Sequence, residues 1–281
     1  MSSSIKIIEC PRDAMQGIQE FIPTQNKIEY INQLLKVGFD TIDFGSFVSP
    51  KAIPQLKDTS EVLEGLYLQN NSSKLLSIIA NKIGAEQACL FKQIDYLGFP
   101  LSISEEFQKR NTNKTIVESI GVLQEIQNLC IQKNKSLVVY LSMAFGNPYG
   151  EKYHPEIAAE LTEKLHQLDV KIIALSDTIG VSNPANIAPL FSTLISEYSE
   201  IEFGAHFHTT PEKWKEKVDS AYQNGCRRFD SAIKGFGGCP IAKDDLTGNM
   251  PTEKIISYFS DQLEINKEEF DKSLKLSETI F

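Results

Sequence analysis

Residues Ile201 to Gly225, IEFGAHFHTTPEKWKEKVDSAYQNG, indicate the architecture of the whole chain most clearly. The first part, Ile201–Phe207, is a largely apolar run of strand length. After Thr210 and Pro211, apolar residues recur at helical spacing, and Gly225 supplies a stop signal. The stretch therefore predicts one strand followed by one helix, which is the repeating unit of a parallel sheet with crossover helices.

The same unit recurs along the whole chain. A second helix, for example, is expected after Thr24, with Gly38 as its stop. Eight units in roughly 250 residues fit a (β/α)8 TIM barrel, whereas a doubly wound open sheet more often has about five or six strands. We therefore predict an α/β fold of the TIM-barrel type. The expected strands are Ile5–Ile8, Thr41–Phe44, Leu75–Ile79, Ile94–Phe99, Leu137–Ser142, Lys171–Leu175, Ile201–Phe207 and Arg227–Ser231.

Composition bounds the class of protein. Hydrophobic residues make up 41% of the 281 residues and charged residues 23%, which is typical of a globular protein with a substantial core. No linker or composition shift divides the chain, so we expect a single domain, with the barrel over about residues 5–260 and a helical tail over residues 261–281. The formal net charge of −9 argues against nucleic acid as a partner.

Cellular location is also predicted from composition. No apolar run reaches the length of a membrane span, and the first residues lack the pattern of a signal peptide, so no membrane partner is expected. The five cysteines form an odd, scattered set without a CxxC motif, which suits free thiols better than a disulfide framework. We expect a cytoplasmic protein.

Candidate active-site residues follow from the barrel, because its catalytic groups come from the carboxyl ends of the strands and the loops after them. The first strand runs into Arg12 and Asp13, an adjacent cation and carboxylate that is also common in surface turns. On the seventh strand, the period of two puts His206 and His208 on one face and Phe207 on the other. Two imidazoles at this spacing can hold one metal ion, although a histidine on an apolar strand can also be purely structural.

A glycine-rich segment, Lys234–Ala242, follows the last expected strand and contains Cys239. Its glycines permit either a mobile lid that carries the thiol over the barrel mouth or a simple flexible connector. No Lys-Ser/Thr pair follows the glycines, so a nucleotide P-loop does not fit. At the end of the sixth strand, Asp177 either faces the site or caps the next turn.

The rim residues also suggest a metal. Asp13, His206, His208 and Asn249 would together offer two oxygens and two nitrogens. This set needs no thiolate and leaves positions for substrate oxygens, so it suits octahedral Mg2+ or Mn2+ better than a closed tetrahedral zinc site. The expected cofactor is a divalent metal ion that acts as a Lewis acid.

Taken together, these residues resemble the 3-hydroxy-3-methylglutaryl-CoA lyase family of metal-dependent carbon–carbon lyases. The resemblance runs from about Ile5 to Tyr258, and its motifs occur in the family's order. The segment Ser46–Lys51 and the Gly237–Pro240 loop point to the lyase rather than to the condensing isopropylmalate and homocitrate synthases. The matching motifs are Pro11-Arg12-Asp13, Ser46-Phe47-Val48-Ser49-Pro50-Lys51, Asp177-Thr178-Ile179-Gly180, His206-Phe207-His208 and Gly237-Gly238-Cys239-Pro240.

The resemblance implies an activity and a role for each residue. The activity is metal-assisted retro-Claisen cleavage of 3-hydroxy-3-methylglutaryl-CoA into acetoacetate and acetyl-CoA, so the partner is an acyl-CoA substrate. Arg12 would neutralise charge on a substrate oxygen, and Cys239 would be the catalytic thiol on the lid. A homodimer formed through the barrel helices is compatible with the family. The implied metal ligands are Asp13, His206, His208 and Asn249, the implied catalytic residues are Arg12, Asp13, His206 and Cys239, and the implied substrate-binding residues are Arg12, Gln16, Asp43, Ser46 and Asp177.

Several positions depart from the family's pattern. Ala14 stands where the family usually has Gly, Asp43 replaces a customary Glu, and Thr209 replaces the Asp that commonly follows the histidine pair. Val138 occupies a place where the family usually has Arg, and the Cys239–Asn249 segment is one residue longer than usual. These differences keep open an alternative, a related metal-dependent lyase or aldolase that acts on a different 3-hydroxyacyl-CoA or a 2-oxo acid.

Two further interpretations use the same residues. Hydrolysis by a metal-bound water would fit the ligands, but amidohydrolase barrels usually carry their His-x-His pair on the first strand. A barrel that only senses metal and acyl-CoA has no need of a thiol on a lid, so Arg12, Asp13 and Cys239 together favour an enzyme.

Overall fold

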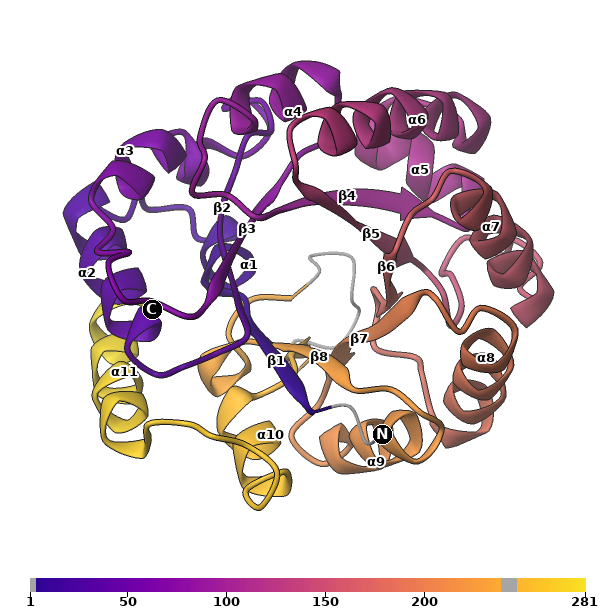
Figure 1. Ribbon diagram of the computed structural model, residues 1–281. Coiled ribbons are helices and arrows are strands. Elements are labelled where there is room, and N and C mark those ends of the chain that lie inside the picture. The colour runs from indigo at the N-terminus through magenta and orange to yellow at the C-terminus, as the bar shows by residue number, and fades with distance from the viewer. Residues whose placement is uncertain (1–3, 239–246) are drawn as a thin grey trace.

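The computed structural model describes residues 4–238 and 247–281. Its centre is a ring of eight parallel strands in which each strand pairs with the next and β8 pairs with β1, so that the sheet closes into a barrel (Figure 1). The predicted (β/α)8 fold is confirmed. The strands are β1 Lys6–Glu9, β2 Thr41–Ser46, β3 Lys74–Ile78, β4 Tyr96–Ser102, β5 Ser136–Ser142, β6 Ile172–Asp177, β7 Glu202–Thr209 and β8 Arg228–Ser231.

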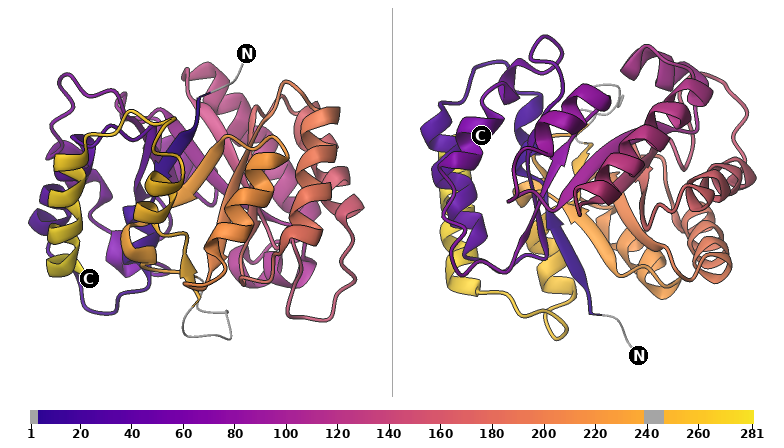
Figure 2. Two further views of the ribbon diagram at one scale, coloured as in Figure 1. Left: turned by 90° about the horizontal axis from the view of Figure 1, so that it is seen from below. Right: turned by 45° about the horizontal axis from the view of Figure 1, so that its top comes forward.

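Helices surround this barrel on its outside, as the views in Figures 1 and 2 show. The helices of the described residues are α1 Pro11–Gln16, α2 Thr24–Leu35, α3 Thr59–Glu64, α4 Lys82–Ala88, α5 Glu105–Thr112, α6 Ile116–Gln132, α7 Pro155–Gln167, α8 Pro184–Glu197, α9 Trp214–Gln223, α10 Thr252–Tyr258 and α11 Lys267–Ile280, with 3-10 turns η1 Pro54–Leu56 and η2 Ile233–Gly235. None of these helices is both long enough and apolar enough to span a membrane.

All eight predicted strands exist, and their bounds differ from the predicted ones by a few residues at most. A strand of a closed parallel barrel is covered on both faces, so its sequence is apolar along its length. In β6, for example, all six residues are buried. One predicted helix start differs in detail, because Thr24 is the first residue of α2 and its hydroxyl donates to Asp58 instead of capping the helix.

The apolar residues form two clusters, because successive side chains of a strand point to opposite sides of the sheet. The larger cluster fills the space between the strands and the helices. The smaller cluster lies inside the barrel and contains Val138, which is fully buried two residues before Tyr140. Its buried members are Leu76, Ile78, Val138, Tyr140, Ile172 and Ala174. Beside this cluster lies the buried Arg228, whose guanidinium pairs with Glu202 and stacks over Tyr96.

The predicted C-terminal tail contains α11, which packs against α2 from the start of the chain (Figure 2). The Phe270 ring meets the Phe39 ring at a centroid distance of 6.4 Å, and the Phe281 ring meets the Tyr30 ring at 5.7 Å. Aromatic contacts thus join the C-terminal helix to α2 and the turn that follows it.

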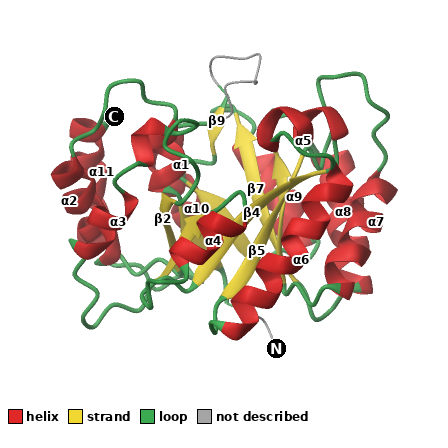
Figure 3. Cartoon of the chain, turned by 90° about the horizontal axis from the view of Figure 1, so that it is seen from above, coloured by secondary structure: helices red, strands yellow, loops and turns green. Residues whose placement is uncertain are grey.

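A short strand, β9 (Gly248–Asn249), brings the residues after the glycine-rich segment back to the barrel. It pairs antiparallel with β7 and sets Asn249 opposite His208. Figure 3 shows β9 and α1 at the same end of the barrel, where the parallel strands finish. This end collects the predicted site residues.

Candidate functional site

The predicted metal ligands Asp13, His206 and His208 meet at the carboxyl end of the barrel. One ligand atom from each lies within 4.8 Å of the others. The sequence places them there because α1 begins directly after β1 with Pro11 in its first turn, so Asp13 lies just above the barrel, while both histidines share a face of β7.

Each histidine is oriented by a hydrogen bond at Nδ1. The His206 Nδ1 lies 3.0 Å from Asp230 Oδ2, and the His208 Nδ1 lies 2.9 Å from the Thr178 carbonyl oxygen. A ring fixed through Nδ1 presents Nε2 as its ligand atom, which is the usual arrangement around a metal-binding histidine. The structure therefore prepares two Nε2 atoms for one cation.

Two buried atoms of this cluster have no hydrogen-bond partner among the residues that the structure describes. They are Oδ2 of Asp13 and Nε2 of His208. A buried polar atom without a hydrogen-bond or metal partner destabilises the folded state by its desolvation penalty. A carboxylate oxygen beside an imidazole nitrogen is a suitable pair of ligands for a divalent cation. The residues present thus fit the expected metal ion.

Asn249, the fourth predicted ligand, lies on β9 opposite His208. Its Nδ2 donates to the Phe236 carbonyl oxygen at 2.8 Å, so Oδ1 is the atom of this side chain that can act as a ligand. The close approach of the chain here depends on Gly237, which has φ +83° and whose position would put a Cβ 2.7 Å from the Asp13 carbonyl oxygen. Only glycine fits between α1 and β9 at this point.

Arg12 lies beside the candidate metal ligands and is held from two sides. Its Nε and Nη2 donate to Asp43 Oδ2 at 2.9 and 2.5 Å, and its Nη1 donates to Asp13 Oδ1 and Gln16 Oε1, both at 2.9 Å. Burial lowers the pKa of Arg12, but the charges of Asp43 and Asp13 raise it more, so the net pKa lies above its ordinary value. The site thus contains a permanent, immobilised cation.

The ionisation of the two carboxyls differs. Burial raises the pKa of Asp13, but Arg12 and the two imidazoles outweigh burial and bring it to about 2, so Asp13 is an anion at neutral pH. For Asp43, burial outweighs the attraction of Arg12 and raises the pKa to about 6. Asp13 therefore has the charge that a metal ligand needs, and Asp43 serves as the partner of the guanidinium.

The two histidines also differ. Burial lowers the pKa of His206, but the hydrogen bond and charge of Asp230 raise it more, so the net pKa is above its ordinary value. Burial and the neighbouring His206 lower the pKa of His208. His208 is therefore neutral at pH 7, which is the form that binds metals.

These residues open onto a cavity of about 440 Å3 at the barrel mouth. Its lining combines polar and apolar side chains, and Tyr140 packs edge-on against His206. The apolar residues include Val48, Ile53, Ile78, Pro100 and Phe107, and the polar residues are Arg12, Asp13, Gln16, Asn111, Thr112, Ser142, Ser176, Thr178, His206 and His208. The cavity can thus contact both oxygens and carbons of a bound molecule.

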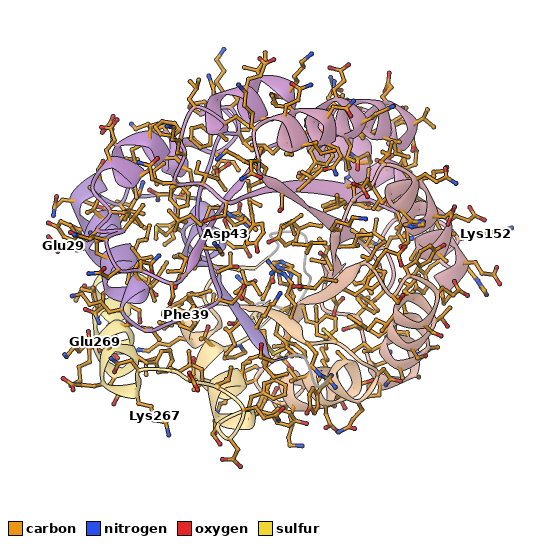
Figure 4. The ribbon with its side chains drawn as sticks, viewed as in Figure 1. Glu29, Phe39, Asp43, Lys152, Lys267 and Glu269 are labelled. Carbon is orange, nitrogen blue, oxygen red and sulfur yellow. The ribbon has the colours of Figure 1, made fainter. Side chains whose placement is uncertain are left out.

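The remaining predicted site residues lie outside the described lining of this cavity. Asp43 accepts from the guanidinium of Arg12, and Figure 4 shows Asp43 on the inner side of the helix ring. Ser46 is buried, and its Oγ accepts from the Val48 amide. Asp177 accepts from the amides of Val181 and Ser182, so it caps the turn after β6. The predicted catalytic thiol of Cys239 lies outside the described residues.

Several residues of the site have no place in the sequence-based prediction. Asp230, at the carboxyl end of β8, could have been found by the same rim rule that identified Asp13. Thr178 acts through its backbone carbonyl, which any residue type could supply. Lys217 lies on α9 in a lysine-rich helical pattern that reads as solvated surface, yet its side chain is fully buried.

Comparisons with known proteins agree on one group of enzymes. The family model described as HMGL-like matches residues 5–280. Hydroxymethylglutaryl-CoA lyase YngG of Bacillus subtilis is 32% identical over 263 residues, which cover 91% of this chain and 84% of that protein. The cytoplasmic 3-hydroxy-3-methylglutaryl-CoA lyase of Rattus norvegicus is 32% identical over 253 residues, which cover 90% of this chain and 73% of that protein.

Solved structures of the same group share the fold over nearly the whole chain. The HMG-CoA lyase of Bacillus subtilis superposes with a TM-score of 0.92 at 30% identity and covers 98% of this chain and 93% of that one. An HMG-CoA lyase from Acinetobacter baumannii, in complex with coenzyme A and 3-methylmalate, gives a TM-score of 0.90 at 30% identity and covers 100% and 93%. The resemblance predicted from the motifs is confirmed.

Proposed function

The chain belongs to the HMGL-like family, a family of carbon–carbon lyases, and from that premise we propose that it cleaves 3-hydroxy-3-methylglutaryl-CoA into acetoacetate and acetyl-CoA. One observation carries the proposal. Asp13, His206 and His208 converge within 4.8 Å beside the buried guanidinium of Arg12, at the mouth of a cavity. This arrangement combines a candidate metal centre with a fixed cation where a substrate would bind.

The reaction separates two carbon atoms. The tertiary hydroxyl of the substrate loses its proton, the bond to the thioester α-carbon breaks, and the electron pair of that bond passes into a thioester enolate. A proton added to the α-carbon then gives acetyl-CoA. A divalent cation, which we propose to be Mg2+ or Mn2+ held by Asp13, His206, His208 and Asn249, supplies Lewis acidity to the substrate oxygens when bound.

Asp13 and His206 are the two proposed routes for the hydroxyl proton. His206 has one ring nitrogen on Asp230, so only Nε2 remains, and this atom cannot both hold a cation and accept a proton. Asp13 Oδ1 is engaged by Arg12 and Gln16, but Oδ2 has no hydrogen-bond partner among the described residues, and a carboxylate oxygen has two lone pairs, one for a cation and one for a proton. We therefore assign the proton route to Asp13 and a ligand role to His206.

Arg12 stabilises the enolate oxygen in this proposal. A guanidinium keeps its charge in a site with little water, and the contacts to Asp43, Asp13 and Gln16 hold it in place before substrate binds.

Cys239 is the proposed acid that protonates the α-carbon. A Cys239→Ser variant should keep the fold and the metal but lose most of its turnover, measured as acetyl-CoA release, and a fully active variant would remove the thiol from the mechanism.

The experiment that tests the function is turnover of 3-hydroxy-3-methylglutaryl-CoA by the chelator-treated protein, assayed with Mg2+, with Mn2+ and without metal. We expect both acetoacetate and acetyl-CoA in equal amounts, and only when metal is present. Lys152→Ala, at the outer edge of the helix ring in Figure 4, is the control variant and should match the wild type. A folded, metal-loaded protein that releases neither product would end the proposal.

A second candidate, a lyase for another 3-hydroxyacyl-CoA, is favoured by the scarcity of cations in the lining of the cavity. Arg12 is the only cation in the described lining, and two carboxylates already engage it. Val138 replaces a customary arginine and lies within the apolar core below the cavity. A panel of 3-hydroxyacyl-CoA esters with and without a free carboxylate separates the two candidates by their relative kcat/KM.

We also propose a cytoplasmic location and a homodimer. The first is supported by the cysteines, because Cys10, Cys89, Cys130 and Cys226 are free thiols. The second rests on the family resemblance and is tested by the mass of the protein in solution.

A further inference from the structure

Lys217 is a buried lysine whose ammonium group joins three segments at the barrel mouth. It lies on α9, which packs outside β7 in Figure 1, and its side chain has no exposed surface. Its Nζ donates to Asp177 Oδ2 at 2.7 Å, to the His208 carbonyl oxygen at 2.8 Å and to the Gly180 carbonyl oxygen at 3.1 Å. An ammonium group has three donors, so all of them are used.

A buried ion pair of this kind needs a reason other than stability. Removing both charges from water is costly, and a well-packed apolar pair of similar volume is often equally stable. Here the Lys217 and Asp177 side chains are 0% and 1% exposed. The pair instead fixes local geometry, because its hydrogen bonds hold the backbone of the turn after β6 and the His208 carbonyl in place.

The first segment that Lys217 holds is the turn after β6. Asp177 accepts from the Val181 amide at 2.8 Å and from the Ser182 amide and hydroxyl at 3.0 and 2.5 Å, so its carboxylate organises the whole turn. Gly180 lies in the same turn with φ +74°. Lys217 therefore contacts this turn twice, at the Asp177 carboxylate and at the Gly180 carbonyl oxygen.

The turn in question orients His208. Its residue Thr178 accepts from His208 Nδ1 through the backbone carbonyl, at 2.9 Å, and its hydroxyl accepts from the Met143 amide at the same distance. Lys217 holds the His208 backbone as well, through the carbonyl oxygen. His208 is therefore held at its backbone carbonyl by Lys217 and at its ring nitrogen Nδ1 by the turn that Lys217 also contacts.

We propose that Lys217 is a positioning residue for the metal centre, which clamps the Asp177–Ser182 turn to the end of β7 and so holds the His208 imidazole with Nε2 toward the cation. This inference rests on the proposed function in one respect, namely that a divalent metal ion binds at this site. Loss of a partner that orients a metal-binding side chain lowers metal affinity by about 10- to 100-fold in other sites. The same loss is expected here without any contact between Lys217 and the metal.

The test compares two buried lysines. Lys27 is also almost fully buried, and its Nζ donates to both oxygens of Asp58 and to the Gln55 carbonyl oxygen, away from the candidate metal ligands. Lys217→Met and Lys27→Met therefore remove the same kind of ammonium group. The readout is the Kd of Mn2+ for the chelator-treated full-length protein, measured by titration calorimetry, with Tm recorded in parallel.

We expect both variants to lower Tm, but only Lys217→Met to raise the Mn2+ Kd, by about 10- to 100-fold. An unchanged Kd in folded Lys217→Met, or an equal rise in Lys27→Met, would overturn the proposal. Should Lys217→Met fail to fold, the double variant Lys217→Gln/Asp177→Asn, which removes both charges, is measured in its place. A raised Mn2+ Kd in this variant supports the proposal, and an unchanged Kd overturns it.

Failure of the proposed function gives a different result. A wild-type protein that binds Mn2+ but does not cleave 3-hydroxy-3-methylglutaryl-CoA would end the lyase assignment and leave the Lys217 comparison valid. A wild-type protein that binds no Mn2+ would overturn the role of Lys217.

Discussion

Glu9 shows how a single buried carboxyl affects the whole fold. It ends β1 with no exposed surface, and it accepts from the Ile233 amide at 3.0 Å and from the Thr252 hydroxyl at 2.5 Å. Burial is the main cause that raises its pKa from 4.5 to about 8, against the two hydrogen bonds that lower it. At neutral pH the folded protein therefore keeps Glu9 protonated, whereas the unfolded chain ionises it.

This pKa predicts a pH dependence of stability. Between about pH 4.5 and pH 8 the folded state binds one more proton at Glu9 than the unfolded state, so the stability from this group is full below pH 4.5 and is lost as pH rises through 8. The slope is about 1.4 kcal/mol per pH unit. In Glu9→Gln, the free energy of unfolding in urea should fall less between pH 5 and pH 8 than in the wild type.

The control for this prediction is Glu29→Gln, since Glu29 is exposed on α2 and lies at the outer edge of the molecule in Figure 4. Its stability should follow the wild type at every pH. Parallel pH profiles for the wild type and Glu9→Gln would contradict the assigned pKa.

Arg12 gives a second prediction at the scale of one residue. Arg12→Gln removes the fixed cation, and the loss of one preorganised donor typically costs about 3 to 4 kcal/mol of transition-state stabilisation. We expect kcat to fall by about 100- to 1,000-fold while Mn2+ still binds. Asp43, with a pKa of about 6, can take up a proton once its partner is gone, so the fold should persist. Wild-type turnover in this variant would exclude a role for the guanidinium.

Among the elements, α1 is approached closely by the backbone at Gly237, shortly after β8. At Gly237 a Cβ would lie 2.7 Å from the Asp13 carbonyl oxygen and 2.8 Å from the Ala14 Cα, and the φ of +83° is one that other residues rarely adopt. A side chain here must push α1 away from β9. That movement would separate Asp13 from Asn249, two of the proposed ligands.

Gly237→Ala should therefore weaken Mn2+ binding, by at least about 10-fold as for other losses of ligand orientation. Gly121→Ala on α6 is the matched control, because a Cβ there meets nothing within 4 Å. Calorimetric titration of both variants with Mn2+ checks the prediction. Equal affinities would show that α1 and β9 tolerate the added methyl group.

At the scale of the whole molecule, the proposed ligands connect parts of the chain that are far apart in sequence. Asp13 lies in α1, the two histidines lie on β7, and Asn249 lies on β9. An unfolded chain cannot bring these atoms together. Metal binding therefore favours the folded state by mass action.

This linkage predicts a metal-dependent Tm. At a Mn2+ concentration of 100 times Kd the stabilisation is about 2.7 kcal/mol, which for a chain of this size corresponds to a rise in Tm of roughly 5 °C. The measurement is calorimetric melting with chelator and with Mn2+. The double variant His206→Ala/His208→Ala should show no rise, and a rise equal to that of the wild type would place the metal elsewhere.

Much of this architecture could be predicted from the chain. The strands are recognisable because a barrel strand is covered on both faces and stays apolar, as β6 illustrates. His206 and His208 could be paired because the period of two is a local property of any strand. For Asp177 the sequence left two orientations open, and the structure shows the side chain capping the next turn.

Properties that depend on neighbours along the chain, namely the eight strand-and-helix units and the residues at each strand end, could be predicted from the amino acids alone. Which of these residues meet is known only from the folded molecule, for example that Asn249 pairs with His208 and that Lys217 is buried against Asp177. Hydrophobic periodicity is a local signal, whereas contact, burial and the pKa values that follow from burial depend on how distant segments pack.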